Sequence, residues 1–301
     1  MRLVADVGGT NTRIGLARDG KLLGESVRSF LNDDFASFTD VIAQYQRDAS
    51  AVTLTDMAVA VAGPVGEGSA RLTNRDWSFC TTDLSARYGN IPSLLLNDLG
   101  ALGQAVPTFD QDSLHAIWGT DATNPQQALI VGVGTGFNVS PVLLRGGEPF
   151  CLNAELGHAA LPVDIHHALA NRISSAADEF MTVEHLFSGR GLSRAYALVT
   201  KDPMPPKHVL SADMGAAQIK FAEFYAELLA ILTRNLLLSF LPEGGVYFAG
   251  GVARTLLTSP ACDRFIQTYS APMALADGLH APVRVITDDA AALKGCARVV
   301  I

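Results

Sequence analysis

Three glycine-rich segments each follow a short apolar run and could hold an anion: Gly8-Gly9-Thr10, Gly134-Thr135-Gly136 and Gly250-Gly251. Glycine lets backbone N–H groups approach an anion without a Cβ clash, and threonine adds a hydroxyl donor. Any one of the three could be an ordinary hairpin turn. Together, and with Asp6 just before the first, they favour a site that binds phosphate groups.

A second candidate for chemistry is Asp98, which follows the apolar run Leu94–Leu96 at the start of a predicted helix. Because the N-terminus of a helix stabilises a carboxylate, we expect Asp98 to be ionised at neutral pH and able to act as a general base. The pair Asn97-Asp98 is also what an ordinary helix N-cap requires. The residues alone leave both interpretations open.

Other motifs of nucleotide and metal sites are absent from the sequence. No GxxxxGK[ST] segment occurs, which excludes a P-loop enzyme, and the glycines after residue 132 lack the GxGxxG spacing of a dinucleotide-binding fold. There is no HExxH and no cluster of His and Cys. His166 and His167 are adjacent, so their side chains diverge, which favours surface residues over a metal site.

Length and composition narrow the class of protein. A chain of 301 residues suffices for two lobes, and 49% hydrophobic against 17% charged residues excludes a disordered chain. A net charge of -8 without any basic run argues against nucleic acid or an anionic membrane as a partner. Four scattered cysteines are typical of a reduced cytoplasm. The apolar stretch Phe224–Leu241 contains Glu227 and Arg234, which favours a buried helix.

Strands and helices must position these residues, and the hydrophobic pattern predicts where they lie. Apolar runs predict a hairpin of strands 3–7 and 12–17, and further strands over 57–62, 93–96, 128–133, 137–144 and 246–249. Helical spacing predicts helices over 35–46, from 97 onward, over 211–240 and over 288–299. Asp288 and Asp289 would occupy the first turn of the last helix. Residues 107–127 are expected to be rich in loops.

Five motifs occur in an order known from one family: DVGGTNTR over 6–13, LNDLGAL over 96–102, GVGTG over 132–136, ELGH over 155–158 and AGGV over 249–252. The smaller segments TNRDWSF (73–79) and SGRGL (188–192) also fit. The chain resembles the bacterial glucokinases, hexokinase-like sugar kinases of the actin/Hsp70/hexokinase superfamily. The resemblance implies an α/β fold of two ribonuclease-H-like (actin-like ATPase) lobes with mixed sheets and an interlobe cleft. Residues 1–107 with 285–301 would form the small lobe, and 108–284 the large lobe.

The resemblance also implies an activity and assigns residues to it. The enzyme would transfer the γ-phosphoryl group of ATP to the 6-hydroxyl of glucose, with Asp98 as general base and Mg²⁺ on the phosphates. The sugar hydroxyls would be held by Asn97, Asp98, Glu155, His158 and Glu184. The nucleotide would be bound by Asp6, Gly8, Gly9, Thr10, Gly134, Thr135, Gly136, Gly250 and Gly251, with Asp6 as an outer-shell ligand of Mg²⁺. Without the resemblance, Glu155 would be interpreted as a solvated acid and His158 as a structural histidine.

The family also suggests a cytoplasmic homodimer that acts in glycolysis, with no nucleic-acid or membrane partner. No zinc is expected, because the cysteine-rich signature of the related repressor/ORF/kinase sugar kinases is absent.

Two positions depart from the family pattern. Leu156 stands where a second glycine is usual, and we expect its bulk beside the sugar. Asn138 stands where glycine is frequent, and we expect it to tune the nucleotide turn. Three alternatives remain: a non-catalytic sugar or nucleotide sensor on the same fold, a kinase for another hexose, and a chaperone-like or filament-forming ATPase. The intact Asp98 argues against the sensor, and the short chain against the chaperone.

Overall fold

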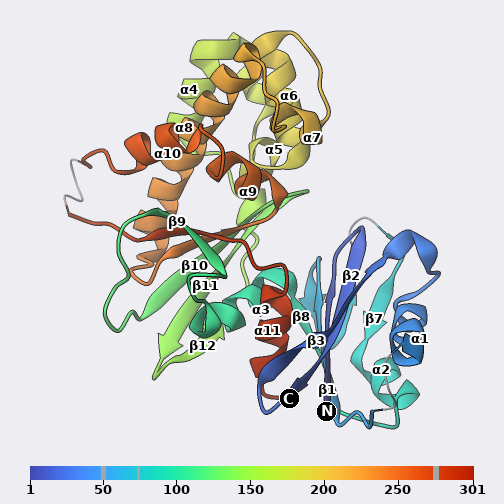
Figure 1. Ribbon diagram of the computed structural model, residues 1–301. Helices are drawn as coiled ribbons and strands as arrows, with labels where there is room; N and C mark the ends of the chain where they lie inside the picture. Colours follow the sequence, from blue (N-terminus) through green and yellow to red (C-terminus); the bar gives the residue numbers. More distant parts are fainter. Residues whose placement is uncertain (49–51, 73–74, 274–277) are drawn as a thin grey trace. The chain divides into compact units, whose positions relative to one another are not determined.

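The computed structural model describes residues 1–48, 52–72, 75–273 and 278–301. The chain divides into two compact units: unit 1 comprises residues 1–109 and 288–301, and unit 2 comprises residues 110–287. Each unit has a main sheet of its own with helices packed on it (Figure 1). The first two residues of the TNRDWSF motif, Thr73 and Asn74, lie outside the described residues. The lobe boundaries and the cleft expected from the sequence stay predictions.

The main sheet of unit 1 has the strand order β3-β2-β1-β4-β8. Its strands are β1 (Arg2–Val7), β2 (Asn11–Arg18), β3 (Lys21–Leu31), β4 (Asp56–Val61) and β8 (Ser93–Asn97). β1 and β2 pair antiparallel as the predicted hairpin, whereas β1, β4 and β8 are parallel, so the sheet is mixed. Val7, Val61 and Asn97 are in register. The residues that follow the three parallel strands therefore meet at one edge of the sheet.

Alternate side chains of β1 enter two different cores, because successive residues of a strand point to opposite faces. Leu3, Ala5 and Val7 pack with α1 (Phe38–Asp48) and α2 (Thr81–Arg87). Val4 packs on the other face with α3 (Asp98–Ala105) and α11 (Ala291–Arg298). Although α3 and α11 are far apart in the sequence, they lie side by side against this sheet (Figure 1). A small antiparallel sheet completes the unit, made of β5 (Val65–Gly66), β6 (Ser69–Arg71) and β7 (Ser78–Cys80).

The sheet of unit 2 has the order β12-β11-β10-β13-β14-β9, and β10, β13 and β14 are parallel. Its strands are β9 (Leu114–Trp118), β10 (Gln127–Val133), β11 (Phe137–Arg145), β12 (Glu148–Cys151), β13 (Val246–Ala249) and β14 (Val283–Ile286). Its helices are α4 (Val163–Ile173), α5 (Val183–Leu186), α6 (Gly189–Thr200), α7 (Pro206–Val209), α8 (Ala216–Phe240), α9 (Gly251–Leu257) and α10 (Cys262–Tyr269).

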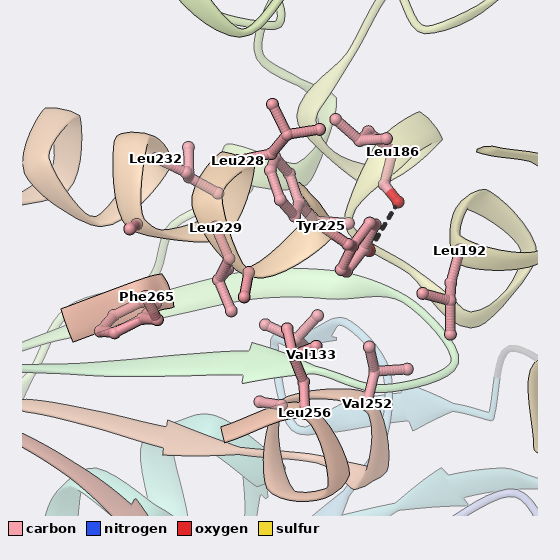
Figure 2. Packing of buried hydrophobic residues seen from close by; sticks show 14 of the residues in the cluster. Val133, Leu186, Leu192, Tyr225, Leu228, Leu229, Leu232, Val252, Leu256 and Phe265 are labelled. Carbon is pink, nitrogen blue, oxygen red and sulfur yellow. Dashed lines mark hydrogen bonds between the residues drawn. The ribbon is translucent and has the colours of Figure 1, made fainter. Parts of the chain in front are cut away.

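The core of unit 2 forms where α8 and α9 pack on β10 and β13. Figure 2 shows Val133 of β10 with Leu229 of α8 and Leu256 of α9 around it, and all three side chains are fully buried. The hydroxyl of Tyr225 in α8 donates a hydrogen bond of 2.9 Å to the carbonyl oxygen of Leu186 (Figure 2). Burial raises the pKa of this phenol, so it stays protonated and keeps the bond. The bond ties the end of α5 to the core.

Seven strands of the described residues were not predicted from the sequence: β3, β5, β6, β7, β9, β12 and β14. Two of the longer ones, β9 and β3, show one reason. β9 lies within the segment expected to be rich in loops, at the edge of the unit 2 sheet. β3 lies at the edge of the unit 1 sheet and carries no buried residue, so it lacks the apolar run that predicts a strand. Both strands are edge strands whose pairing partners are specified by the neighbouring strand rather than by their own pattern.

Three helices begin later than predicted, and the first of them, α1, starts at Phe38 instead of residue 35. α8 starts at Ala216 because Gly215 is its N-cap, and the Gln218 side chain accepts from the Gly215 N–H at 2.9 Å. α11 starts at Ala291, so Asp288 and Asp289 precede the helix instead of lying in its first turn. Asp288 Oδ1 accepts from the backbone N–H of Ala290 at 2.8 Å. No helix among the described residues combines the length and the apolar character needed to cross a membrane.

Candidate active site

The parallel strands of unit 1 bring two carboxylates, Asp6 and Asp98, to one edge of the sheet. Asp6 lies in β1 opposite Ala60 of β4, and Ala60 lies opposite Leu96 of β8. Asp98 follows two residues after Leu96, as the first residue of α3. The fold therefore places Asp6 in β1 and Asp98 just after β8 at the same edge of the sheet, with β4 between the two strands.

The start of α3 fixes the backbone around Asp98. Asn97 is the N-cap: its Oδ1 accepts from the backbone N–H of Leu99 at 3.0 Å, and its Nδ2 donates to the carbonyl oxygen of Gly63 at 3.0 Å. Asp98 Oδ1 accepts from the same N–H of Leu99 at 2.9 Å. The N-cap interpretation of the Asn-Asp pair is therefore confirmed, and the same N–H also holds the Asp98 carboxylate; the role of Asp98 as a base stays a prediction.

The electrostatics of this edge differ from the expectation for a helix N-terminus. Burial, and after it the charge of Asp6, raises the pKa of Asp98 to about 7, although hydrogen bonds from the backbone N–H groups of Leu99 and Asp98 and from the Asn97 side chain lower it. Burial likewise raises the pKa of Asp6 to about 6. The helix terminus and these hydrogen bonds favour the ionised carboxylate, as expected from the sequence, but desolvation outweighs them, so the pKa of Asp98 lies above its ordinary value.

Arg13 is the cation of this edge. It lies opposite Asp6 in the β1–β2 hairpin, and its Nη1 is 3.9 Å from Asp6 Oδ2. Its Nη2 is 3.8 Å from Asp289 Oδ2, just before α11. Arg13 lowers the pKa of Asp6 and Asp289 raises it, both less than burial does. Arg13 therefore stabilises the ionised form of the Asp6 carboxylate.

The first glycine turn, Gly8-Gly9-Thr10, is held from outside by Asn32, a residue that sequence analysis missed. The fully buried Asn32 donates from Nδ2 to the carbonyl oxygen of Gly8 at 2.8 Å. Its backbone N–H donates to the carbonyl oxygen of Thr10 at 2.8 Å, and its Oδ1 accepts from the Thr12 hydroxyl at 2.7 Å. Only the chain fold joins Asn32 to this turn, so no local pattern could have indicated it.

The other two glycine turns lie against one another in unit 2. The turn between β10 and β11 closes with a bond of 2.9 Å from the N–H of Gly134 to the carbonyl oxygen of Gly136. A Cβ added at Gly134 would lie 3.7 Å from the Cα of Gly250, the residue that joins β13 to α9. Gly250 has φ +91°, and a Cβ there would lie 2.5 Å from the carbonyl oxygen of Val133. Close backbone approach therefore requires glycine at position 250.

Glu184 of α5 contacts the β10–β11 turn at the point where β11 begins. Its Oε2 accepts from the backbone N–H of Phe137 at 3.1 Å, and its Oε1 is 3.6 Å from Arg190 Nη2. A Cβ added at Gly136 would lie 2.7 Å from Glu184 Oε2, so glycine makes room for the carboxylate. One oxygen of Glu184 is thus occupied by the turn itself.

Glu155 and His158 lie on the loop that follows β12, and both are exposed. The N–H of His158 donates to the carbonyl oxygen of Glu155 at 3.2 Å, within the turn of 3-10 helix Leu156–His158. Gly157 in the same turn lies directly against the carbonyl oxygen of Phe137 and close to the Cβ of Glu184. The structure therefore gathers Glu155, His158 and Glu184 around the start of β11.

The structure shows the contacts of both residues that depart from the family pattern, and their expected effects on the sugar and on the nucleotide turn stay predictions. The Leu156 side chain packs against the core of unit 2, which accounts for its bulk. Asn138 bonds to the loop of Glu155 and not to the glycine turn. The contacts of the Asn138 side chain are a second feature that the sequence did not indicate.

Comparison with known proteins decides the family. A family model described as Glucokinase matches residues 3–300. The chain belongs to the glucokinase family. A glucokinase of Chromobacterium violaceum is 30% identical over 311 residues, which cover 98% of this chain and 88% of the relative. A glucokinase of Saccharophagus degradans is 27% identical over 309 residues, which cover 98% of this chain and 96% of the relative. The family resemblance stated from the motifs is confirmed.

Solved structures confirm the fold class. A glucokinase from an Antarctic psychrotroph matches with a TM-score of 0.82 at 23% identity, over 99% of this chain and 97% of that one. A ROK family glucokinase from Streptomyces griseus, in complex with glucose and AMPPNP, matches with a TM-score of 0.66 at 20% identity, over 98% of each chain. The predicted α/β fold with mixed sheets is thus the fold of glucokinases.

Proposed function

We propose that this member of the glucokinase family transfers the γ-phosphoryl group of ATP to the 6-hydroxyl of glucose, with Asp98 as general base. The observation that carries the base assignment is the start of α3, where the Asn97 cap and the backbone N–H of Leu99 hold the Asp98 carboxylate; the pKa of Asp98, raised to about 7 by burial and by Asp6, supports it. A general base is most effective when its pKa lies near the operating pH. As the sugar oxygen attacks phosphorus, its proton passes to the Asp98 carboxylate, and ADP leaves with the electron pair of the broken P–O bond.

Sugar selectivity would come from polar side chains that each meet a hydroxyl. Asn97 and Asp98 in unit 1, and Glu155, His158 and Glu184 in unit 2, are the residues that we assign to this role. A carboxylate accepts from hydroxyls and an imidazole can donate or accept, so the set matches a polyol. A site that hydrogen-bonds each hydroxyl rejects analogues that lack one by a factor on the order of 10⁴.

The nucleotide would be held by the glycine turns. In unit 1, Gly8, Gly9 and Thr10 offer backbone N–H groups and a hydroxyl to phosphate oxygens. In unit 2, the turn Gly134-Thr135-Gly136 would take phosphates, and Gly250-Gly251 would let the adenosine pack against backbone. The close approach of Gly134 to Gly250 supports a single nucleotide surface in unit 2.

The residues at this edge fit Mg²⁺, which favours oxygen ligands, keeps several waters and usually takes one or two carboxylates plus substrate phosphates. Asp6 offers a carboxylate whose pKa burial raises to about 6, so a cation nearby would stabilise its ionised form. No cluster of three or more His, Cys, Asp or Glu that could hold a metal occurs among the described residues. Asp6 would hold the ion through water, and the ion would neutralise phosphate charge.

The family relationship supports further proposals on context. We expect the chain to act in the cytoplasm as a homodimer, at the entry of glucose into glycolysis. The relatives named glucokinase support the sugar, and the complex of the Streptomyces griseus enzyme with glucose and AMPPNP supports both substrate classes.

Release of ADP, followed with a coupled assay across a panel of sugars, tests the proposal. Glucose, mannose, fructose and N-acetylglucosamine would each be offered with ATP and Mg²⁺, with a sugar-free control. We expect ADP release that depends on sugar and a kcat/KM that is highest for glucose.

Three other outcomes would contradict the proposal. Hydrolysis of ATP that does not depend on sugar would indicate an ATPase. Binding of glucose without turnover would indicate a sensor. A preference for another hexose would keep the kinase and change its substrate.

A further inference from the structure

The side chain of Asn138, second residue of β11, uses both ends of its amide on the loop that carries Glu155. Its Oδ1 accepts from the backbone N–H of Leu156 at 3.0 Å and from its own neighbour Val139 at 2.9 Å. Its Nδ2 donates to the carbonyl oxygen of Ala154 at 2.7 Å and to Glu155 Oε2 at 3.2 Å. A single side chain therefore bonds to three consecutive residues, 154–156.

The orientation of this amide is determined by its partners. Two N–H donors face Oδ1 and two oxygens face Nδ2, so turning the amide over would set donors against donors and oxygen against oxygen. The network leaves one arrangement, in which a hydrogen of Asn138 points at the carboxylate of Glu155.

The loop needs this support because its own backbone provides little. Residues 152–154 belong to neither helix nor strand, and the turn of 3-10 helix begins only at Leu156. The Leu156 side chain is anchored in the core of unit 2, whereas the Glu155 side chain is exposed. An exposed glutamate samples many rotamers, and fixing it in one of them costs side-chain entropy. Asn138 reduces this cost by holding one carboxylate oxygen and leaving Oε1 for a ligand.

We propose that Asn138 is a positioning residue for glucose binding, acting through Glu155. Asn138 itself touches no substrate. It fixes the backbone of residues 154–156 and the rotamer of Glu155 before the sugar binds. The inference rests on the proposed function, because it takes from there the role of Glu155 in binding a sugar hydroxyl.

The test measures the Kd for glucose by isothermal titration calorimetry on the full chain without ATP. We expect Asn138→Ala to weaken glucose binding roughly 10-fold, the effect of losing one hydrogen bond to a charged group. Asn138→Asp keeps the size and the Oδ1 acceptor but replaces the donor with a second oxygen facing Glu155. We expect it to weaken binding at least as much, and as a near-isosteric change it covers the case in which the alanine variant folds poorly.

A matched control comes from the same strand. Ser140, two residues further along β11 and nearly fully buried, donates from Oγ to the carbonyl oxygen of Leu152 at 3.3 Å and does not bond to residues 154–156. We expect Ser140→Ala to leave the glucose Kd within about 2-fold of the parent while changing thermal stability by an amount similar to the Asn138 variants. A general loss of packing would weaken glucose binding in Ser140→Ala as well as in the Asn138 variants.

A double-mutant cycle with Glu155→Ala decides whether Asn138 acts through Glu155. We expect Asn138→Ala to add less than about 2-fold in the Glu155→Ala background, since coupled residues are not additive. A full 10-fold effect in that background would overturn the inference. So would a strong effect of Glu155→Ala with none of Asn138→Ala, which leaves the proposed function intact. No effect of Glu155→Ala would contradict the sugar-binding role itself and the inference with it.

Discussion

The chemistry at Asp98 is set by desolvation and by a neighbouring acid more than by the helix that Asp98 begins. The helix N-terminus and the N–H of Leu99 favour the ionised carboxylate, yet the pKa still rises to about 7. Sequence analysis could recognise the helix start and the candidate base, since both are local patterns. It could not predict the pKa, because the proximity of Asp6 depends on the strand order β1-β4-β8.

The raised pKa predicts a particular pH dependence of catalysis. A base must be deprotonated to accept the proton of the 6-hydroxyl, so kcat/KM should rise with pH and level off above an apparent pKa of about 7. Initial rates at low concentrations of both substrates, measured from pH 5.5 to 9, check this. An Asp98 with an unshifted pKa would give a profile that is flat over the same range.

The same shift predicts that Asp98 destabilises the fold at alkaline pH. Because the folded-state pKa is raised, the folded chain binds more protons than the unfolded chain between about pH 4 and 7, and stability falls as pH rises through that window. Asp98→Asn keeps the Oδ1 acceptor for Leu99 and removes the charge. It should be more stable than the parent at pH 8.

Asp98→Asn should raise the free energy of unfolding at pH 8 by roughly 1–2 kcal/mol more than it does at pH 5.5. Urea unfolding at the two pH values measures the difference, and the lower pH serves as the internal control. An equal change in the free energy of unfolding at both pH values would mean that burial does not raise the pKa of Asp98.

At the scale of elements, the junction of β13 with α9 shows how backbone contact shapes the proposed nucleotide surface. Gly250 has a positive φ and lies against Val133, whereas a Cβ added at its neighbour Gly251 would meet no atom within 4 Å. The two glycines look alike in the sequence, and only the fold separates them.

Gly250→Ala should lower the free energy of unfolding by about 2–4 kcal/mol, because a Cβ would force the β10 and β13 ends apart in a backbone conformation that alanine disfavours. Gly251→Ala, in the first position of α9, should change stability by less than about 0.5 kcal/mol. Chemical denaturation of both variants makes the comparison. Similar losses for the two would contradict the close approach seen at Gly250.

Most of the longer strands of the two main sheets and the longest helix were predicted from their hydrophobic pattern, but the buried strand β14 and the amphipathic helices α4, α6 and α10 were not, although each has such a pattern. The hairpin β1–β2, the strands β4, β8, β10, β11 and β13 and most of α8 follow from apolar runs and helical spacing. β3 and β9 are edge strands that follow no such pattern. α11 begins after Asp288 and Asp289 because these residues bond and pair before the helix starts.

At the scale of the whole molecule, the last residues of the chain complete the first unit. α11 places Leu293, Cys296 and Ala297 in the core that also contains Val4 of β1 and Ala101 of α3. α3 begins with Asp98, so the C-terminal segment supports the helix that carries the proposed base. The order of five motifs was enough to predict the family and the fold class from the sequence.

Leu293→Ala should therefore destabilise unit 1 by about 2–4 kcal/mol, the usual cost of a large-to-small change in a core. Val300→Ala, at a position 94% exposed just beyond the helix, should cost less than about 0.5 kcal/mol. Hydrogen exchange of the β1 and β4 amides locates the effect. Loss of protection confined to unit 2 would contradict the assignment of α11 to unit 1.

What sequence could not supply is the set of long-range contacts that hold the site residues. Asn32 bonds to the Gly8 turn and Asn138 to the Glu155 loop, and Arg13 forms an ion pair with Asp289, each across a gap in sequence that no local pattern spans. The roles assigned to Asp98, Glu155, His158 and Glu184 stay predictions to be tested at the bench.

The most direct test compares phosphoryl transfer and glucose binding in Asp98→Asn. The rate of glucose 6-phosphate formation should fall by about 10²–10⁴-fold, the usual contribution of a general base. The Kd for glucose, measured by calorimetry on the same protein, should rise by no more than about 10-fold. A variant that binds glucose and still forms glucose 6-phosphate at close to the parent rate would contradict the proposed role of Asp98.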